Sequence, residues 1–248
     1  MWEISITSSS KNRHYLVELK KNLIAKFKKD GIICVCEKLQ NQYVLSVACF
    51  EKVNEIKSYL KQLLIEIIVL TSKEEFMNKN IVMNSVSETC RLAFIKALIY
   101  FDYENDLAML EDKVSMDSNI NIEAFGKFKC SELKSKWAEL IDATSYNSVY
   151  LNNYEIFLDF LKFLIESIKP TFKEVNVYYR NNLFIMLDEK GKKISNNNCS
   201  KYYKDEFGLV TDLIMLAPEK INFFCENLSN ETKKLISYIF CGRIKNLI

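Results

Sequence analysis

The C-terminal segment of this chain constrains its fold more than any other part. From residue 209 onward it reads as a helix (209–216), a stop (217–218), a strand (221–225) and a second helix (235–240). Residues 242–244 then form a second stop and the start of a second strand. Pro218 cannot continue the helix before it, and Gly242 supplies the positive φ that commonly ends a helix. We therefore predict a small parallel strand-helix-strand unit.

The same segment resembles one protein family, the YtxC-like sporulation proteins of endospore-forming bacteria. The resemblance is carried by Asp212-Leu213-Ile214-Met215-Leu216-Ala217-Pro218-Glu219-Lys220-Ile221 and by Ile239-Phe240-Cys241-Gly242-Arg243-Ile244. Further matching stretches at residues 122–129, 154–163, 175–177 and 187–192 extend it over roughly residues 118–248. The family is defined by its association with sporulation. The resemblance thus implies a role in sporulation without implying a reaction.

Composition indicates a globular protein without a chain-wide charge. Of 248 residues, 49% are hydrophobic and 27% charged, which is enough to form a sizeable core, and 34 basic against 32 acidic residues leave a net charge of only +2. The N-terminus lacks a basic lead followed by a long apolar segment, so we expect no secretory signal. The longest aliphatic stretch, residues 63–70, is far shorter than the roughly 20 residues that span a bilayer. We therefore expect a cytoplasmic protein with no transmembrane segment.

Hydrophobic periodicity predicts an α+β fold in two regions, residues 1–117 and 118–248. The first region reads as a strand at residues 2–7, a basic helix at residues 12–29 and a hairpin at residues 31–50. Two long helical segments follow and end near residue 112. Ser72 with Glu75 and Ser85 with Glu88 have the spacing of capping boxes, which would begin those two segments. Residues 113–121 are polar and predict a linker.

The second region reads as a helical pair, a β-meander and the strand-helix-strand unit. Residues 131–141 and 153–169 have helical periodicity, and the second of these helices has such a narrow polar stripe that we expect it to be central and mostly buried. Asn181-Asn182 separates two β-rich runs. Because Asn tolerates the positive φ of tight turns, these runs predict a hairpin.

The eight cysteines leave two interpretations open. Cys34 and Cys36 are two residues apart in a predicted strand and share one face, and Cys49 lies in the neighbouring strand. These three thiols could form a metal or redox cluster. The alternative is that reduced cysteines serve as small core residues, as is usual in cytosolic proteins.

Familiar catalytic motifs do not occur. The only histidine, His14, lies in the basic segment of the first helix, and the five glycines are too far apart for a phosphate-binding loop. Pairs of carboxylates, such as Asp102 with Asp106 or Asp188 with Glu189, could bind Mg²⁺ or share a proton, but acidic residues are also common in turns. We therefore expect no enzyme activity, catalytic residue, cofactor or metal site.

Four other features are candidates for an interaction surface. The first helix includes Lys20 and Lys21 within a local balance of 7 − 1 = +6 over residues 11–29, which could bind nucleic acid or an anionic membrane surface or could be a solvated face. Tyr178 and Arg180 should share one face of a hairpin strand and could stack on bases or contact a partner. The resemblance adds Lys129 and Arg243 as recurrent basic positions, although either could pair with acidic neighbours.

These observations favour a cytosolic, non-enzymatic sporulation protein that acts through contacts with an unknown protein partner. The alternatives are binding to nucleic acid or to an anionic membrane surface through the basic first helix, and a thiol or metal protein that uses Cys34, Cys36 and Cys49.

Overall fold

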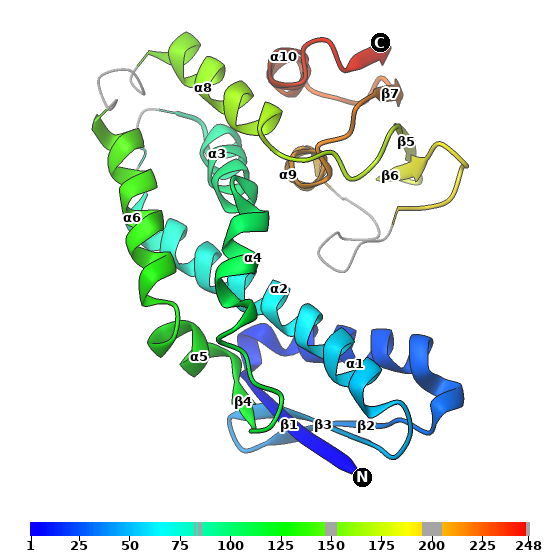
Figure 1. Cartoon of the computed structure of the whole chain (residues 1–248). Coiled ribbons are helices and arrows are strands. Elements are labelled where there is room, and N and C mark those ends of the chain that lie inside the picture. Colours follow the sequence, from blue (N-terminus) through cyan, green and yellow to red (C-terminus); the bar gives the residue numbers. More distant parts are fainter. Residues whose placement is uncertain (82, 84–85, 147–152, 195–204, 247–248) are drawn as a thin grey trace. The chain divides into compact units, whose positions relative to one another are not determined.

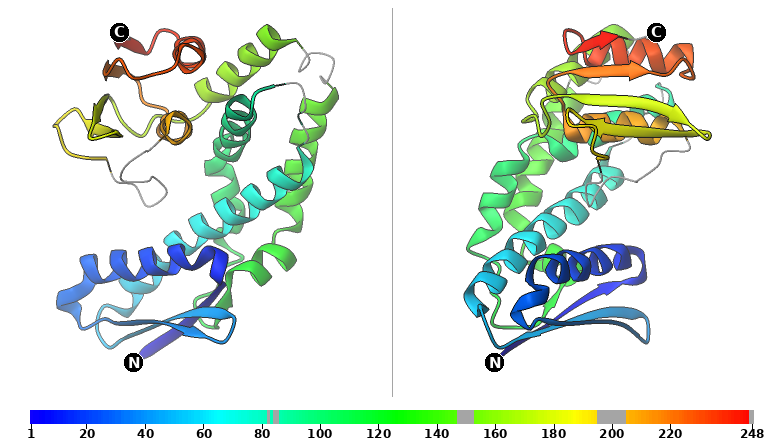
Figure 2. Two further views of the ribbon diagram at one scale, coloured as in Figure 1. Left: turned by 180° about the vertical axis from the view of Figure 1, so that it is seen from behind. Right: turned by 90° about the vertical axis from the view of Figure 1, so that its right-hand side faces the viewer.

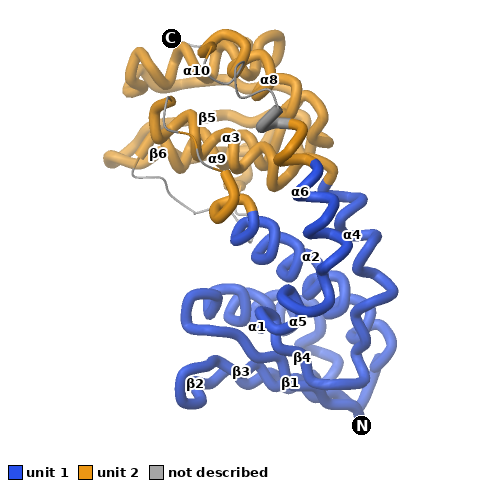
Figure 3. Tube along the Cα trace, turned by 90° about the vertical axis from the view of Figure 1, so that its left-hand side faces the viewer, with its two compact units in different colours: residues 1–76, 103–139 blue, residues 77–102, 140–248 orange. Residues whose placement is uncertain are grey.

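The protein has an α+β fold, as predicted (Figure 1). The computed structural model describes residues 1–81, 83, 86–146, 153–194 and 205–246. The chain divides into two compact units (Figure 3), unit 1 with residues 1–76 and 103–139 and unit 2 with residues 77–102 and 140–248. The boundary expected from the sequence, after residue 117, falls inside unit 1. The division into residues 1–117 and 118–248 as two regions stays a prediction.

Unit 1 is built on a four-stranded sheet in the order β2-β3-β1-β4. Its elements are β1 (Trp2–Ser9), α1 (Arg13–Phe27), β2 (Ile33–Leu39), β3 (Gln42–Cys49), α2 (Val53–Asn80), α4 (Tyr103–Glu111), β4 (Ile120–Asn121), α5 (Ile122–Phe128) and α6 (Ser131–Tyr146), with 3₁₀ turns at Ser10–Asn12 and Lys28–Asp30. The last residues of α2 and α6 belong to unit 2. Alternation along β1 and β3 buries Ile4, Ile6, Leu45 and Val47 on the face that α1 covers (Figure 1).

The segment predicted as a linker contributes a strand to unit 1 instead. β4 pairs in parallel with β1, with Ile120 opposite Ile6 and Asn121 opposite Thr7. Side chains reinforce this junction, because Asn119 Oδ1 accepts a hydrogen bond of 3.0 Å from Ser5 N. Polar residues here pair with the backbone of β1, which is why the stretch has no strand-like hydrophobic pattern.

Helix boundaries differ from the predicted capping boxes. Ser72 lies deep inside α2 and is buried, so it begins no helix. Ser85 lies outside the described residues, and α3 (Glu88–Tyr100) begins after Ser87, whose Oγ accepts a hydrogen bond from Cys90 N. The helical run predicted to continue to residue 112 is interrupted at Asp102, which has a φ of 57°.

Unit 2 contains a mixed sheet in the order β6-β5-β7-β8. Its elements after α3 are α8 (Tyr154–Glu166), β5 (Val175–Arg180), β6 (Leu183–Asp188), α9 (Glu206–Leu216), β7 (Ile221–Phe224), α10 (Asn230–Ile239) and β8 (Ile244–Asn246). The predicted hairpin is present, with Asn181 and Asn182 at φ values of 54° and 59°. β7 and β8 pair in parallel around α10, and Gly242 has a φ of 83°, which confirms the strand-helix-strand prediction (Figure 2).

The central helix of unit 2 is α9 and not α8. All residues of α9 from Leu209 to Leu216 are buried, whereas α8 leaves Tyr154, Ile156 and Phe163 exposed. The prediction for α8 was wrong. A narrow polar stripe shows that most of a helix surface is apolar, but it does not show how much of that surface neighbouring elements cover. None of the helices in the described parts of the chain is both long and apolar enough to cross a bilayer.

Candidate functional site

A groove in unit 1 brings Lys20 and Lys21 together with apolar side chains. It lies between α1 and the strands β2 and β3 and has a volume of about 510 Å³. Its lining residues are Arg13, Val17, Lys20, Lys21, Ile24, Ala25, Cys36 and Tyr43. α1 places its buried leucines on the sheet, and the residues on its flank form the wall of this groove. The groove is therefore apolar with three cationic side chains.

The cations of α1 divide between the groove and the rest of the unit. The Arg13 guanidinium lies 4.9 Å from the centre of the Tyr43 ring, a cation-π arrangement that holds it over β3. Lys21 Nζ lies 3.5 Å from Glu18 in a largely exposed pair, which contributes little to stability. Lys26 Nζ is 3.7 Å from the Tyr59 ring of α2 instead. Only some of the basic residues of this helix therefore line the groove.

Strand β2 forms one edge of the sheet beside the groove. It pairs with β3 and with no other strand in the described part of the chain. Ile33, Val35 and Leu39 point away from α1 and are 55%, 44% and 61% exposed. Edge strands in soluble proteins usually carry charges, prolines or bulges that prevent pairing with another chain. β2 carries such charges at Glu37 and Lys38, near its end, and the exposed aliphatic residues beside them are typical of a surface that other chains contact.

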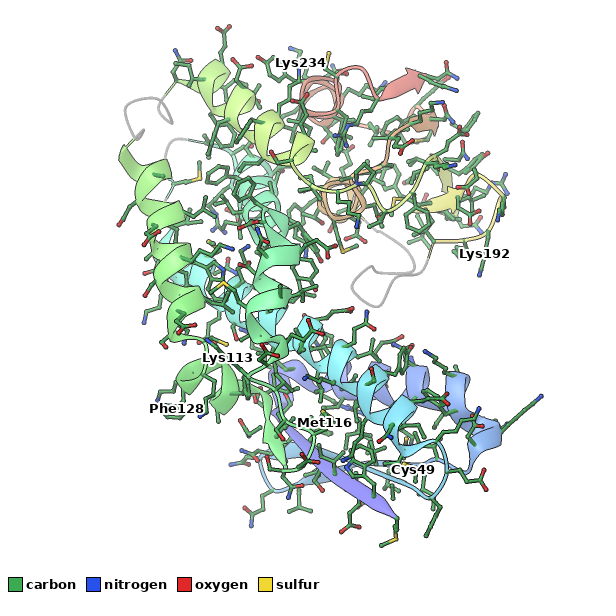
Figure 4. The ribbon with its side chains drawn as sticks, in the orientation of Figure 1. Cys49, Lys113, Met116, Phe128, Lys192 and Lys234 are labelled. Atoms are coloured by element: carbon green, nitrogen blue, oxygen red, sulfur yellow. The ribbon has the colours of Figure 1, made fainter. Side chains whose placement is uncertain are left out.

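The register of the sheet separates Cys36 from Cys49, so the three thiols do not form one cluster. Cys34 is opposite Val47 and Cys36 is opposite Leu45. Cys49 is two residues beyond Val47 and is therefore a diagonal neighbour of Cys34, but it is four residues beyond Leu45, which places it about 13 Å along the strand from Cys36. Cys49 is also buried (Figure 4), and no three His, Cys, Asp or Glu side chains among the described residues are grouped so that they could hold a metal ion.

The ionisation of these thiols also argues against a reactive cluster. Burial raises the pKa of Cys34 to about 11, although the nearby Lys20 ammonium opposes this shift. Burial likewise raises the pKa of Cys49. Since the thiolate is the nucleophile and the metal ligand, both groups are held in their unreactive form at neutral pH.

Lys129 lies apart from the groove, at the end of α5. Its backbone caps that helix by donating a hydrogen bond to Phe125 O, and its side chain is exposed. Phe128, next to it, lies on the outer side of α5 (Figure 4). The structure gives Lys129 no role in the groove.

Tyr178 and Arg180 lie together on the outer face of the sheet of unit 2. Tyr178 stacks on Phe224 of β7, with ring centres 4.8 Å apart, and the Arg180 guanidinium lies 5.4 Å from the Tyr178 ring. Tyr179 points to the opposite face and packs on Phe184. The predicted alternation is thus present. The Tyr178 ring already has two neighbours, Phe224 and Arg180, which makes it a poor platform for a further stacking ligand.

Arg243 stabilises the backbone of the strand-helix-strand unit. Its Nη1 donates hydrogen bonds to Ala217 O at 3.1 Å and to Pro218 O at 3.3 Å. Burial lowers the pKa of the guanidinium, and Glu166 and Glu219 oppose that shift. Ala217 has a φ of 41°, so Arg243 holds a strained turn at the end of α9. These hydrogen bonds give the guanidinium a structural role at the end of α9.

Two polar clusters were not predicted from the sequence. In unit 1, Asp106 is buried and contacts Lys73, Lys136 and Trp137. In unit 2, Glu206 accepts hydrogen bonds from Ser229 and Thr232 at the start of α10, beside a hollow of about 430 Å³. Asp106 follows the polar residues Asp102, Glu104 and Asn105, so nothing local in the sequence distinguished it as buried. The second depends on residues more than twenty positions apart and has no local signal.

The comparisons with known proteins give one match. The model of the YtxC-like family matches residues 39–245. The chain belongs to the YtxC-like family. The match confirms the resemblance, which rested on roughly residues 118–248, and extends it toward the N-terminus as far as residue 39. No curated protein and no solved structure matches the chain.

Proposed function

We propose that this YtxC-like protein acts in the cytoplasm during endospore formation by binding a partner protein, and that it catalyses no reaction. Membership of the family supports the link to sporulation. Binding to a partner protein is supported by the open edge of β2. Three aliphatic side chains are exposed on this strand, and another strand could pair with its free side. Such an edge binds other proteins because its free backbone groups and apolar side chains both gain partners.

Capture from cells tests this proposal. A tagged copy expressed in its own sporulating host should co-purify with one protein in near-stoichiometric amount after nuclease treatment. Val35→Lys places a charge on the β2 edge and should reduce that recovery at least five-fold. A matched variant, Lys28→Glu with Lys29→Glu, alters exposed residues outside the groove and should leave recovery unchanged. If no protein persists at near-stoichiometric amount, the proposal is wrong.

Binding to a polyanion is the second candidate, and the cations of the groove favour it. Arg13, Lys20 and Lys21 lie along one flank of α1, where phosphate groups of nucleic acid or of a membrane surface could neutralise them. Binding of this kind weakens steeply as salt increases, because counterions are released. Lys20→Glu with Lys21→Glu should then abolish binding to labelled oligonucleotides or to anionic vesicles. If that variant binds as the wild type does, this candidate fails.

A further inference from the structure

We propose that the β2 edge and the adjacent groove receive an extended acidic segment of the partner, which adds a fifth strand to the sheet of unit 1. This inference rests on the proposed function, since it names the chemistry of the partner that the β2 edge would bind. The fit follows from the groove, from the exposed side chains of β2 and from the alternation of side chains along a strand.

The backbone of β2 can extend the sheet. β2 has a partner on one side only, β3, and no described strand or helix pairs with its other side. The strand is seven residues long and contains no proline. Added strands in peptide complexes gain affinity from main-chain hydrogen bonds and specificity from alternate side chains. β2 thus provides the main-chain part of such a site (Figure 1).

The two faces of an added strand would meet different chemistry. Side chains that point toward α1 would meet the groove, with Lys20 and Lys21 on its wall and Cys36 in its floor. Side chains that point away would lie beside Ile33 and Val35. Because side chains alternate along a strand, the segment that fits has acidic residues at every second position and apolar residues between them.

Charge decides between this occupant and a second copy of the chain. Pairing of β2 with β2 of another copy would bring two cationic grooves together, which costs free energy because like charges face each other. An acidic partner segment neutralises the same groups. Single-stranded nucleic acid would also neutralise these cations. It would form no strand pairing with the backbone of β2, however, and would not cover Ile33, Val35 and Leu39.

Peptide selection tests the chemistry directly. The probe is an unbiased library of twelve-residue linear peptides displayed on phage and selected on the full-length protein. Enriched peptides should alternate Asp or Glu with Val, Ile, Leu or Phe. Measured by fluorescence anisotropy, their affinity should fall at least ten-fold with Lys20→Glu and Lys21→Glu and less than three-fold with the control variant Lys28→Glu and Lys29→Glu.

Backbone methylation separates strand addition from simple charge attraction. N-methylation of every second residue on one edge of the selected peptide should abolish binding, and methylation on the other edge should preserve it. Three outcomes would overturn the inference: no peptide is enriched, the enriched peptides lack the alternation, or both methylated series bind equally. A labelled oligothymidine that binds with the same dependence on Lys20 and Lys21, while no peptide does, would favour nucleic acid instead.

Co-purification with the Lys20→Glu and Lys21→Glu variant shows whether the acidic-segment inference fails alone or together with the proposed function. If a protein co-purifies from sporulating cells and its recovery is unchanged by Lys20→Glu with Lys21→Glu, the partner binds elsewhere. The acidic-segment inference is then wrong and the interaction function stands.

Discussion

Lys73 Nζ lies 2.6 Å from Asp106 Oδ2, and the two side chains are 1% and 0% exposed. Trp137 Nε1 donates to the same oxygen at 3.1 Å, and Lys136 Nζ lies 2.9 Å from the other carboxylate oxygen. One carboxylate therefore joins α2, α4 and α6 inside unit 1. Burial of ions costs several kcal/mol each, so their mutual contacts are needed to offset that cost.

Removing the negative charge from this cluster should strongly destabilise the protein. In Asp106→Asn the Lys73 ammonium stays buried and loses the carboxylate next to it, so we expect the free energy of unfolding to fall by about 3–5 kcal/mol. Urea denaturation followed by circular dichroism measures the change. Lys73→Met should cost less, because Asp106 keeps Lys136 and Trp137, and the double variant should recover part of the loss. An Asp106→Asn protein within about 1 kcal/mol of the wild type would contradict the expected cost of removing this buried carboxylate.

Gly126 is required by the close packing of α5 on α2. A Cβ at this position would overlap Ser72 Oγ, so Gly126→Ala forces the serine side chain to move. Alanine alone would favour the helix by up to about 1 kcal/mol, yet we expect a net loss of about 1–2 kcal/mol because overpacking outweighs it. Ser72→Ala removes the overlapping oxygen and should restore stability in the double variant. If Gly126→Ala raises the thermal midpoint on its own, the packing argument fails.

Glu123 should make the stability of unit 1 depend on pH. Its Oε1 accepts hydrogen bonds from Ser8 Oγ, Ser9 N and Asn12 Nδ2 at 2.8–2.9 Å. Burial raises the pKa of the carboxyl, but the hydrogen bonds from Ser9, Ser8 and the backbone of Glu123 itself outweigh burial and lower the pKa below the ordinary value of 4.5. A group with a lowered folded pKa stabilises above its unfolded pKa, and this contribution is lost as pH falls through the folded value.

Comparison with an uncharged isostere isolates that contribution. Glu123→Gln should lower the free energy of unfolding by about 1–2 kcal/mol at pH 7, since hydrogen bonds to a charged acceptor are stronger than those to a neutral one. The difference between the two proteins should shrink as pH falls below 4.5. Urea titrations at several pH values measure it. A difference that does not change with pH would show that the charge contributes nothing.

Thiol modification should proceed at the surface before it reaches the sheet. With a pKa of about 11, only about three in ten thousand Cys34 side chains are thiolates at pH 7.5. Cys241 is exposed, so iodoacetamide should modify it at least ten times faster than Cys34 or Cys49. Peptide mapping by mass spectrometry gives the order. Rapid modification of Cys34 in the folded protein would reopen the redox interpretation of this sheet.

Local signals account for the parts of the fold that the sequence predicted well. Asn181-Asn182 and Gly242 adopt the positive φ that their residue types favour, and the leucines of α1 bury the face that their spacing indicated. The parts that were missed depend on distant contacts. β4 is a strand only because it meets β1, and Ser72 is buried because α5 lies against it. No pattern within a few residues records such a contact.

The candidate site was predicted only in part for the same reason. Lys20 and Lys21 were identified by their charge, but the groove also needs Cys36 and Tyr43, which the hairpin brings to the same place. The exposure of Ile33, Val35 and Leu39 was not predicted, because a β-rich run reads alike whether it lies in the middle of a sheet or at its edge. Arg243 donates hydrogen bonds to the turn after α9, which the sequence did not indicate, and its part in an interaction surface stays a prediction.

The parallel pairing of β1 with β4 affects how the protein emerges from the ribosome. β1 is made first, but one of its edges stays unpaired until residues 120 and 121 have been synthesised. Residues 77–102, which belong to unit 2, leave the ribosome before residues 103–139, which complete unit 1. The N-terminal sheet is thus completed late, and β1 is exposed to wrong pairing during translation, a period in which chaperones commonly bind unpaired strand edges.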